Sequence, residues 1–195
     1  MRLVLGLGNP GARYARTRHN VAWQVLDAVA SRREAVPAPG GGAWRARQVR
    51  IGEHDVALVE PLTFMNLSGE ALVEWGRRFG WDPGALLVVT DDVYLPLGTL
   101  RLRAGGSSGG HRGLESVEAA VGHRQYARLR VGVGAAGSGT GLREHVLEEF
   151  APEEWPALEV AIRRAADAVE FWVEQGILPA MNQFNRRVRR EESES

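Results

Sequence analysis

Residues 86–92 of the chain, Leu-Leu-Val-Val-Thr-Asp-Asp, decide the predicted fold class. The run from Leu86 to Thr90 is apolar or β-branched throughout, which is typical of a strand buried on both faces. Such strands occur in sheets that helices cover on both sides. Asp91 and Asp92 follow at the carboxyl end of the strand, the edge at which open α/β sheets bind their ligands. The stretch therefore predicts an α/β protein with its polar chemistry at that edge.

Strand and helix patterns alternate on either side of this strand. Strand patterns cover residues 2–7, 45–51, 55–60, 99–103 and 128–133, and the second and third form a predicted hairpin. Apolar residues at helical spacing predict helices after Thr17, from Ser68 to Gly80, from about Leu114, from Leu142, and through Trp155 and Trp172. Residues 36–43, rich in Pro, Gly and Ala, are expected to form a loop. The alternation predicts a single-domain three-layer sandwich, with a mixed central sheet flanked by helices.

Length and composition support one globular domain. The chain has 195 residues, and we place the domain over residues 1–185, with residues 186–195 as a charged, frayed tail. Hydrophobic residues make up 44% and charged residues 25%, which is ordinary for globular proteins and speaks against disorder. No apolar run approaches the roughly 20 residues of a membrane span, and Gly and Pro interrupt the N-terminus before a secretory signal could form. We expect a cytoplasmic protein with no membrane partner.

Two kinds of cofactor site are tested and set aside. Cysteine is absent, which excludes thiolate metal sites, and no His or carboxylate pair has metal-ligand spacing, so we expect no metal. The segment Gly6-Leu-Gly-Asn-Pro-Gly11 matches the glycine pattern of dinucleotide-binding proteins. Pro10 lacks the N–H that would hold a pyrophosphate, and the helical pattern begins only near Thr17. We therefore reject a dinucleotide and expect no cofactor.

The positive charge is local rather than global. Formal net charge is zero, which at first argues against a nucleic-acid partner, because phosphate binding normally needs a basic surface. The sequence contains no lysine, and Arg101, Arg103, Arg128 and Arg130 fall in two short segments. These arginines are either an ordinary solvated surface or a local phosphate site.

Polar residues from separate segments could converge on one catalytic centre. A lone histidine such as His19 is more often structural than catalytic, but Asp91 at a strand end can accept from one imidazole nitrogen and leave the other as a base. Asn9 and Asn66 offer amide donors and acceptors. A histidine and a carboxylate without an obvious nucleophile point to an activated water. Ser68, Ser107 and Ser108 remain candidate nucleophiles, although none lies in a G-x-S-x-G context.

These segments together resemble the bacterial-type peptidyl-tRNA hydrolases, in order and at matching spacing over nearly the whole chain. The first is Gly6-Leu-Gly-Asn-Pro-Gly-x-x-Tyr14-x-x-Thr-Arg-His-Asn20. The others are Thr63-Phe-Met-Asn-Leu-Ser-Gly69, Asp91-Asp92 with Leu95-Pro-Leu-Gly98, Gly109-Gly-His-x-Gly-Leu114 and Arg128-Leu-Arg-Val-Gly-Val-Gly134.

The resemblance implies an enzyme that uses water to cut the ester between a peptide, or an N-acyl-aminoacyl group, and its tRNA, which recycles tRNA from stalled translation. It implies that His19 is the general base and Asp91 its orienting acid. Substrate-binding residues by the same carry-over are Asn9, Tyr14, Met65, Asn66 and Arg112. Met65, Val93 and Val146 are expected to form an apolar wall under the peptide, and the segment from Leu142 a lid.

The resemblance also gives the arginines a task. Arg103 and Arg130 match the positions at which the family binds the tRNA 5′-phosphate, with Arg101 and Arg128 as neighbours. Guanidinium groups suit phosphate geometry, and adjacent strands can hold them rigidly. A local clamp of this kind is compatible with zero net charge. The expected partner is therefore the acceptor end and 5′-phosphate of peptidyl-tRNA, bound by a monomer.

The chain departs from the family pattern at several positions. Arg112 stands where an Asn usually helps to place the attacking water, and an arginine can donate but cannot accept. Smaller departures are Thr90, Tyr94 and Ser108. The alternative function is a catalytically silent RNA-binding homologue, since homologues of this fold in chloroplasts serve as RNA-splicing cofactors. Retention of His19 and Asp91 favours the enzyme, because a binding module needs no base.

Overall fold

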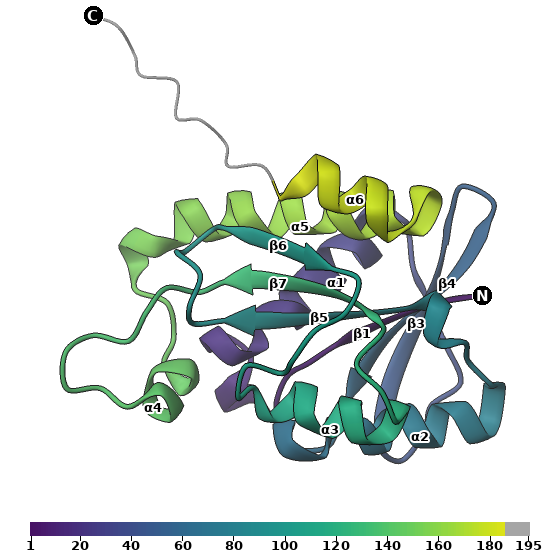
Figure 1. The fold of residues 1–195 in the computed structure, drawn as a ribbon, viewed down its shortest axis with the longest axis horizontal. Helices are drawn as coiled ribbons and strands as arrows, with labels where there is room; N and C mark the ends of the chain where they lie inside the picture. Colours follow the sequence, from purple (N-terminus) through teal and green to yellow (C-terminus); the bar gives the residue numbers. More distant parts are fainter. Residues whose placement is uncertain (186–195) are drawn as a thin grey trace, which may run out of the picture.

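A mixed sheet forms the middle layer of the computed structural model, which describes residues 1–185 (Figure 1). Within these residues the sheet has seven strands in the order β2-β3-β4-β1-β5-β7-β6. The strands are β1 Arg2–Gly6, β2 Val36–Pro37, β3 Trp44–Ile51, β4 His54–Pro61, β5 Leu86–Asp92, β6 Leu100–Arg103 and β7 Ala127–Gly132. The helices are α1 Val21–Arg32, α2 Ser68–Phe79, α3 Arg112–Val121, α4 Leu142–Leu147, α5 Trp155–Gln175 and α6 Ile177–Phe184. Short 3-10 turns are η1 Ala12–Tyr14, η2 Arg18–Asn20, η3 Met65–Leu67, η4 Pro83–Ala85 and η5 Pro152–Glu154.

The strand order places the ends of several strands at one edge. β1 lies parallel to both β4 and β5, and β5 lies parallel to β7, whereas β2, β3 and β6 pair antiparallel with their neighbours. The chain first builds the sheet on one side of β1 and then crosses to the other side, so the order reverses at β1. The carboxyl ends of parallel strands around such a reversal form the usual ligand crevice of α/β sheets.

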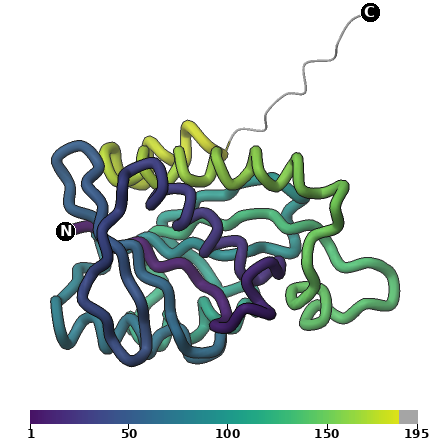
Figure 2. The backbone as a smooth tube through the Cα atoms, turned by 180° about the vertical axis from the view of Figure 1, so that it is seen from behind, coloured from purple at the N-terminus to yellow at the C-terminus, as the bar shows by residue number. Residues whose placement is uncertain are grey.

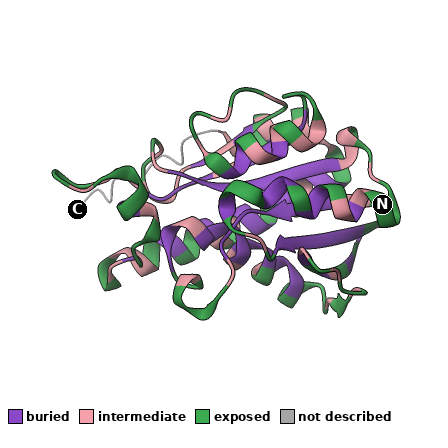
Figure 3. Cartoon of the chain, turned by 90° about the horizontal axis from the view of Figure 1, so that it is seen from below, coloured by how far each residue is buried: buried purple, intermediate pink, exposed green. Residues whose placement is uncertain are grey.

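Two apolar cores hold the helices against the sheet. One core joins α1, α5 and α6 to one face and includes Val25, Leu129 and Trp172. The other joins α2 and α3 to the opposite face and includes Leu72, Trp75 and Leu114. The strands are buried between helices whose outer faces are exposed (Figure 3). This arrangement confirms the predicted three-layer sandwich, and all of β5 is buried, as its sequence indicated.

Some local predictions need correction. Val36 and Pro37 form a two-residue edge strand rather than loop, and both are exposed, so no burial pattern marked them. α1 begins at Val21, after η2, and the Thr17 hydroxyl donates to Tyr14 O rather than capping a helix. α3 begins at Arg112, because His111 caps it. The sequence analysis did not separate α6 from α5; Gly176, with a φ of 81°, divides them.

The remaining predictions concern the ends of the molecule. α4 and the loop before it extend beyond the end of the sheet (Figure 2). The predicted frayed tail, residues 186–195, lies outside the described residues. None of the helices described in residues 1–185 is long and apolar enough to cross a membrane.

Candidate active site

A cavity of about 670 Å³ opens at the carboxyl edge of the sheet. Asn9 follows β1, η3 follows β4, Asp91 lies at the end of β5, and η2 brings His19 to the same place. The cavity is lined by all the residues predicted for catalysis and substrate binding: Asn9, Tyr14, His19, Met65, Asn66, Asp91 and Arg112. The fold therefore brings these residues together from separate parts of the sequence.

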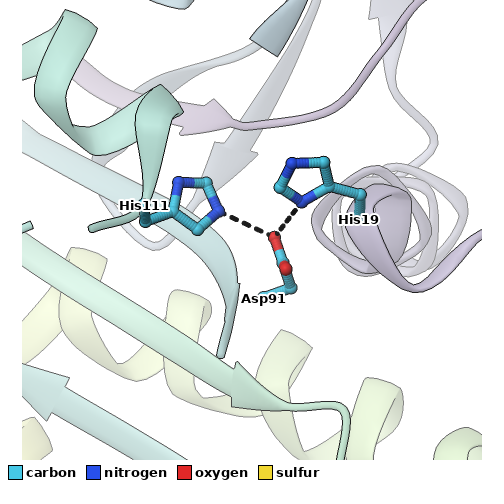
Figure 4. Close-up of side chains that lie close together, drawn as sticks. All are labelled: His19, Asp91 and His111. Carbon is cyan, nitrogen blue, oxygen red and sulfur yellow. Dashed lines mark hydrogen bonds and ion pairs between the residues drawn. The ribbon is translucent and has the colours of Figure 1, made fainter. Parts of the chain in front are cut away.

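His19 and Asp91 form the central hydrogen bond. His19 Nδ1 lies 2.8 Å from Asp91 Oδ1, and the carboxylate is almost fully buried (Figure 4). Burial alone would lower the pKa of His19, but the charge and hydrogen bond of Asp91 outweigh it and hold the pKa above its ordinary value. Burial alone would raise the pKa of Asp91, but the neighbouring histidines hold it well below its usual range. The acid therefore stays ionised and accepts from the ring.

His111 is a second partner of the same carboxylate oxygen, and the sequence analysis had assigned it no role. His111 Nε2 lies 2.9 Å from Asp91 Oδ1 and 2.8 Å from Thr90 Oγ1 (Figure 4). Its Nδ1 accepts from the backbone N–H groups of Gly113 and Leu114 and so caps α3. Because Nδ1 is an acceptor, the proton of the neutral ring must sit on Nε2 and point at Asp91. A histidine between a glycine-rich loop and a helix start was the only local indication of this cap.

The wiring of the two rings bears on metals and on acid–base chemistry. His19, Asp91 and His111 lie close enough to hold an ion. A metal on His111 Nε2 would move the ring proton to Nδ1 and break the cap, so the arrangement does not favour one. His19 Nε2 has no hydrogen-bond partner within residues 1–185. With Nδ1–H directed at Asp91, Nε2 is free to take a proton from water.

Asn9 is held with its amide donors available. Its backbone N–H donates to Asn20 Oδ1, and Asn20 Nδ2 donates back to Asn9 O, both at 2.9 Å. Asn9 Oδ1 accepts from Met65 N–H at 2.8 Å. The oxygen is therefore engaged, and Nδ2 is left to donate into the cavity. Asn66 is an exposed residue of η3 on the same wall.

The serines do not take part in a nucleophile–base pair. Ser68 is buried and its hydroxyl donates to Met65 O. Ser108 lines the cavity, but its Oγ accepts from Gly110 N–H. Ser107 uses its carbonyl to accept from two arginines. Among the described residues no serine hydroxyl is hydrogen-bonded to His19, which favours water as the nucleophile.

The four arginines share one face of the β6–β7 pair, because Arg101 lies opposite Arg130 and Arg103 opposite Arg128. Arg103 is exposed, and Arg130 lines the cavity, where it contacts Asp92 at 3.2 Å. The expectation for Arg128 needs correction, since its side chain is fully buried. It donates to Ser107 O and contacts Glu118, so it braces the loop and is not available to a phosphate.

Comparison with known proteins assigns the family. Residues 3–193 match the family described as peptidyl-tRNA hydrolase. The chain belongs to the peptidyl-tRNA hydrolase family. Relatives with this name from Syntrophomonas wolfei and Symbiobacterium thermophilum are 41% and 42% identical; the alignments cover 95% and 94% of this chain and 100% and 98% of theirs. The crystal structure of peptidyl-tRNA hydrolase from Acinetobacter baumannii superposes with a TM-score of 0.87 at 33% identity, over 95% of this chain and 94% of that one.

The departures from the peptidyl-tRNA hydrolase pattern gather around this cavity. Thr90 contacts His111, and Arg112 is the exposed first residue of α3. Tyr94, which is 71% exposed, lines the cavity, as does Ser108. These substitutions therefore border the catalytic pair without replacing it.

The apolar wall and the lid segment lie where they were expected. Met65, Val93 and Val146 all line the cavity, and so do Leu142 and Leu147 of α4. α4 thus supplies one side of the cavity from a segment that lies beyond the sheet (Figure 1).

Proposed function

We propose that this chain hydrolyses the ester bond between the peptide, or N-acyl-aminoacyl group, and the tRNA of peptidyl-tRNA. The observation that carries the proposal is the hydrogen bond from His19 Nδ1 to the buried, ionised Asp91, in a cavity that also holds Asn9 and Asn66. The names of the relatives support the same activity.

The reaction follows from the free nitrogen of His19. Nε2 takes a proton from water as the oxygen attacks the ester carbonyl carbon. Negative charge develops on the carbonyl oxygen, and the amide donors of Asn9 and Asn66 are placed to stabilise it. The tetrahedral intermediate collapses, the bond to the ribose oxygen breaks, and the imidazolium returns its proton to that oxygen. Asp91 keeps the tautomer correct and stabilises the charged ring.

Substrate binding divides between the cavity and the arginine face. Met65, Val93 and Val146 supply an apolar wall for the peptide, and Tyr14 and Arg112 border its entrance. α4 serves as the lid. The peptide is therefore held by apolar contact on one side and by amide groups on the other.

The tRNA phosphate falls to Arg103 and Arg130, with Arg101 beside them. Arg130 uses Nη1 for Asp92 and Nη2 for Ser107 O, and a guanidinium carries five N–H donors, so it retains donors for a phosphate. Arg128 supports this site from beneath through the shared acceptor Ser107 O.

The wider setting follows from the same proposal. We infer a monomer that acts in the cytoplasm, with residues 1–185 as one catalytic domain that needs no cofactor. The partner is the acceptor end and 5′-phosphate of peptidyl-tRNA.

The test is release of a labelled N-acetyl-aminoacyl group from tRNA. Wild-type protein is expected to release the label, and His19→Ala to lower turnover by roughly two to four decades, with little change in tRNA binding. Near-normal activity of His19→Ala would exclude the mechanism. Wild-type protein that binds the tRNA but leaves the ester intact would support the silent RNA-binding alternative instead.

A further inference from the structure

Arg18, the residue before His19, is buried although it carries a charge. It is 7% exposed and belongs to η2, the turn that presents His19 to the cavity. Its Nη1 donates to Val133 O at 2.9 Å, and its guanidinium binds both oxygens of Glu154, at 3.1 and 2.7 Å. The guanidinium also stacks over the Phe150 ring, 4.7 Å from the centroid. A buried charge with this many directed contacts is held in one geometry.

These contacts join η2 to both ends of the lid segment, which we define as residues 134–147. Val133 lies immediately before the segment, and Glu148, immediately after it, accepts from the Arg18 backbone N–H at 3.0 Å. Thr17 pairs with Glu149 in an isolated β-bridge. Within the segment, His145 Nε2 donates to Gly134 O at 2.9 Å and ties the two ends together. The turn that carries the base is therefore fastened to the root of the lid.

The same residue is linked to the acid. Val133 donates its N–H to Asp92 O at 3.1 Å, directly after Asp91. Arg18 thus has rigid connections to the segment behind each member of the His19–Asp91 pair. Glu154 is held in turn, because its carboxylate accepts from Ala151 N–H at 2.8 Å. Arg18 and hydrogen bonding keep the pKa of Glu154 below its ordinary value against the effect of burial, so the ion pair stays charged.

We propose that Arg18 is a positioning residue: through Val133 and Glu154 it fixes the His19 turn relative to Asp91 and to the root of the lid segment. The inference rests on the proposed hydrolase function. Its chemical basis is the planar fork of arginine, which can bind Glu154 with two nitrogens while one also reaches Val133; the ammonium of lysine cannot reproduce this arrangement. Loss of the fork leaves the charge but loosens the turn.

The experiment compares Arg18→Lys with a matched control. Turnover of labelled N-acetyl-aminoacyl-tRNA is expected to fall roughly 10- to 100-fold in Arg18→Lys, because small displacements of a base are costly, while KM stays within about twofold. The control is Arg16→Lys, since Arg16 forms an exposed pair with Glu149 at 3.8 Å between the same two segments. Wild-type turnover is expected for the control. Wild-type turnover in folded Arg18→Lys, or a loss no greater than its unfolded fraction, overturns the inference.

Glu154→Gln provides a second variant in which the Arg18 contact with Val133 can persist. We expect its turnover to fall between those of wild type and Arg18→Lys, again with KM unchanged. If Arg18→Lys does not fold, Glu154→Gln decides, and wild-type turnover in Glu154→Gln overturns the inference.

An NMR titration of His19 separates this inference from the proposed function, because it does not require activity. In wild type the charge of Asp91 raises the pKa of His19. A looser turn in Arg18→Lys, or in Glu154→Gln, is expected to move this pKa downward, with no shift in Arg16→Lys. Wild-type protein that fails to cleave would overturn the proposed function alone. An unchanged titration in both Arg18→Lys and Glu154→Gln would overturn the positioning role alone.

Discussion

At the residue scale, one oxygen of Asp91 serves two histidines that cannot exchange roles. His111 is fixed as a donor, since protonation of its Nδ1 would break the bonds from Gly113 and Leu114. His19 makes a single hydrogen bond among the described residues and keeps Nε2 free. The backbone at the start of α3 therefore selects which ring can act as the base.

The pH dependence of turnover tests this division. His19 must be neutral to accept a proton, and its folded-state pKa is raised, so turnover should increase with pH through an ionisation above histidine's ordinary value of about 6.5. Activity is lost as the pH falls through that ionisation. In Asp91→Asn we expect a lower turnover and an ionisation shifted downward, because the raising charge is gone. A flat profile from about pH 5 to 8, with chemistry rate-limiting, would contradict His19 as base.

Arg112 tests how much the usual Asn contributes. The missing amide is worth about one hydrogen bond between uncharged groups, roughly 0.5 to 1.5 kcal/mol or about a decade in rate. We therefore expect Arg112→Asn to change turnover by no more than about a decade. Arg112→Ala should weaken tRNA binding more at low than at high salt, because Arg112 is exposed at the cavity. Inactive wild-type protein that Arg112→Asn restores would instead favour the RNA-binding alternative.

At the element scale, the β6–β7 pair assigns different tasks to arginines that are equivalent in the sequence pattern. Arg103 lies at the exposed end of β6, whereas Arg128, opposite it on β7, is covered and bonded to Ser107 and Glu118. Strand register alone places both on one face. The α3 residue Glu118 and the loop before that helix decide which one solvent can reach.

Paired variants of these two arginines should separate binding from stability. Arg103→Ala is expected to raise KM and reduce the salt slope of tRNA binding by about one, as loss of one phosphate contact requires. Arg128→Met should leave the salt slope unchanged and lower the free energy of unfolding by roughly 3 kcal/mol, because it leaves Glu118 without its buried partner. Binding at several salt concentrations and urea unfolding measure the two effects. A lower turnover in Arg103→Ala at unaltered affinity would argue against the phosphate site.

At the scale of the whole molecule, two cores share one sheet. Trp172 belongs to the core under α5, and Trp44 and Trp75 belong to the core under α2 and α3. β5 is buried on both faces and contributes to both cores. Neither helical layer can therefore lose its packing without exposing the strands that support the other.

Unfolding should accordingly be cooperative. We expect urea transitions followed by tryptophan fluorescence and by far-UV circular dichroism to share one midpoint, as in a two-state domain. Trp172→Phe and Trp75→Phe, which remove a reporter from one core each, should each still give coincident transitions. Two separated transitions in either variant would show that the layers unfold independently and would contradict a single domain over residues 1–185.

The sequence by itself determined the α/β class, most strands, the hairpin and the pairing of His19 with Asp91. Those predictions rest on local information: periodicity sets the strand or helix, the direction of β5 sets which end carries the acid, and motifs in a constant order indicate the family. Tertiary structure alone decided the tautomer of His111, the burial of Arg128 and the partners of Arg18. Arg18 reaches Val133 and Glu154 across 115 and 136 positions. Burial and hydrogen-bond geometry at such separations depend on how distant segments pack, which no local pattern specifies.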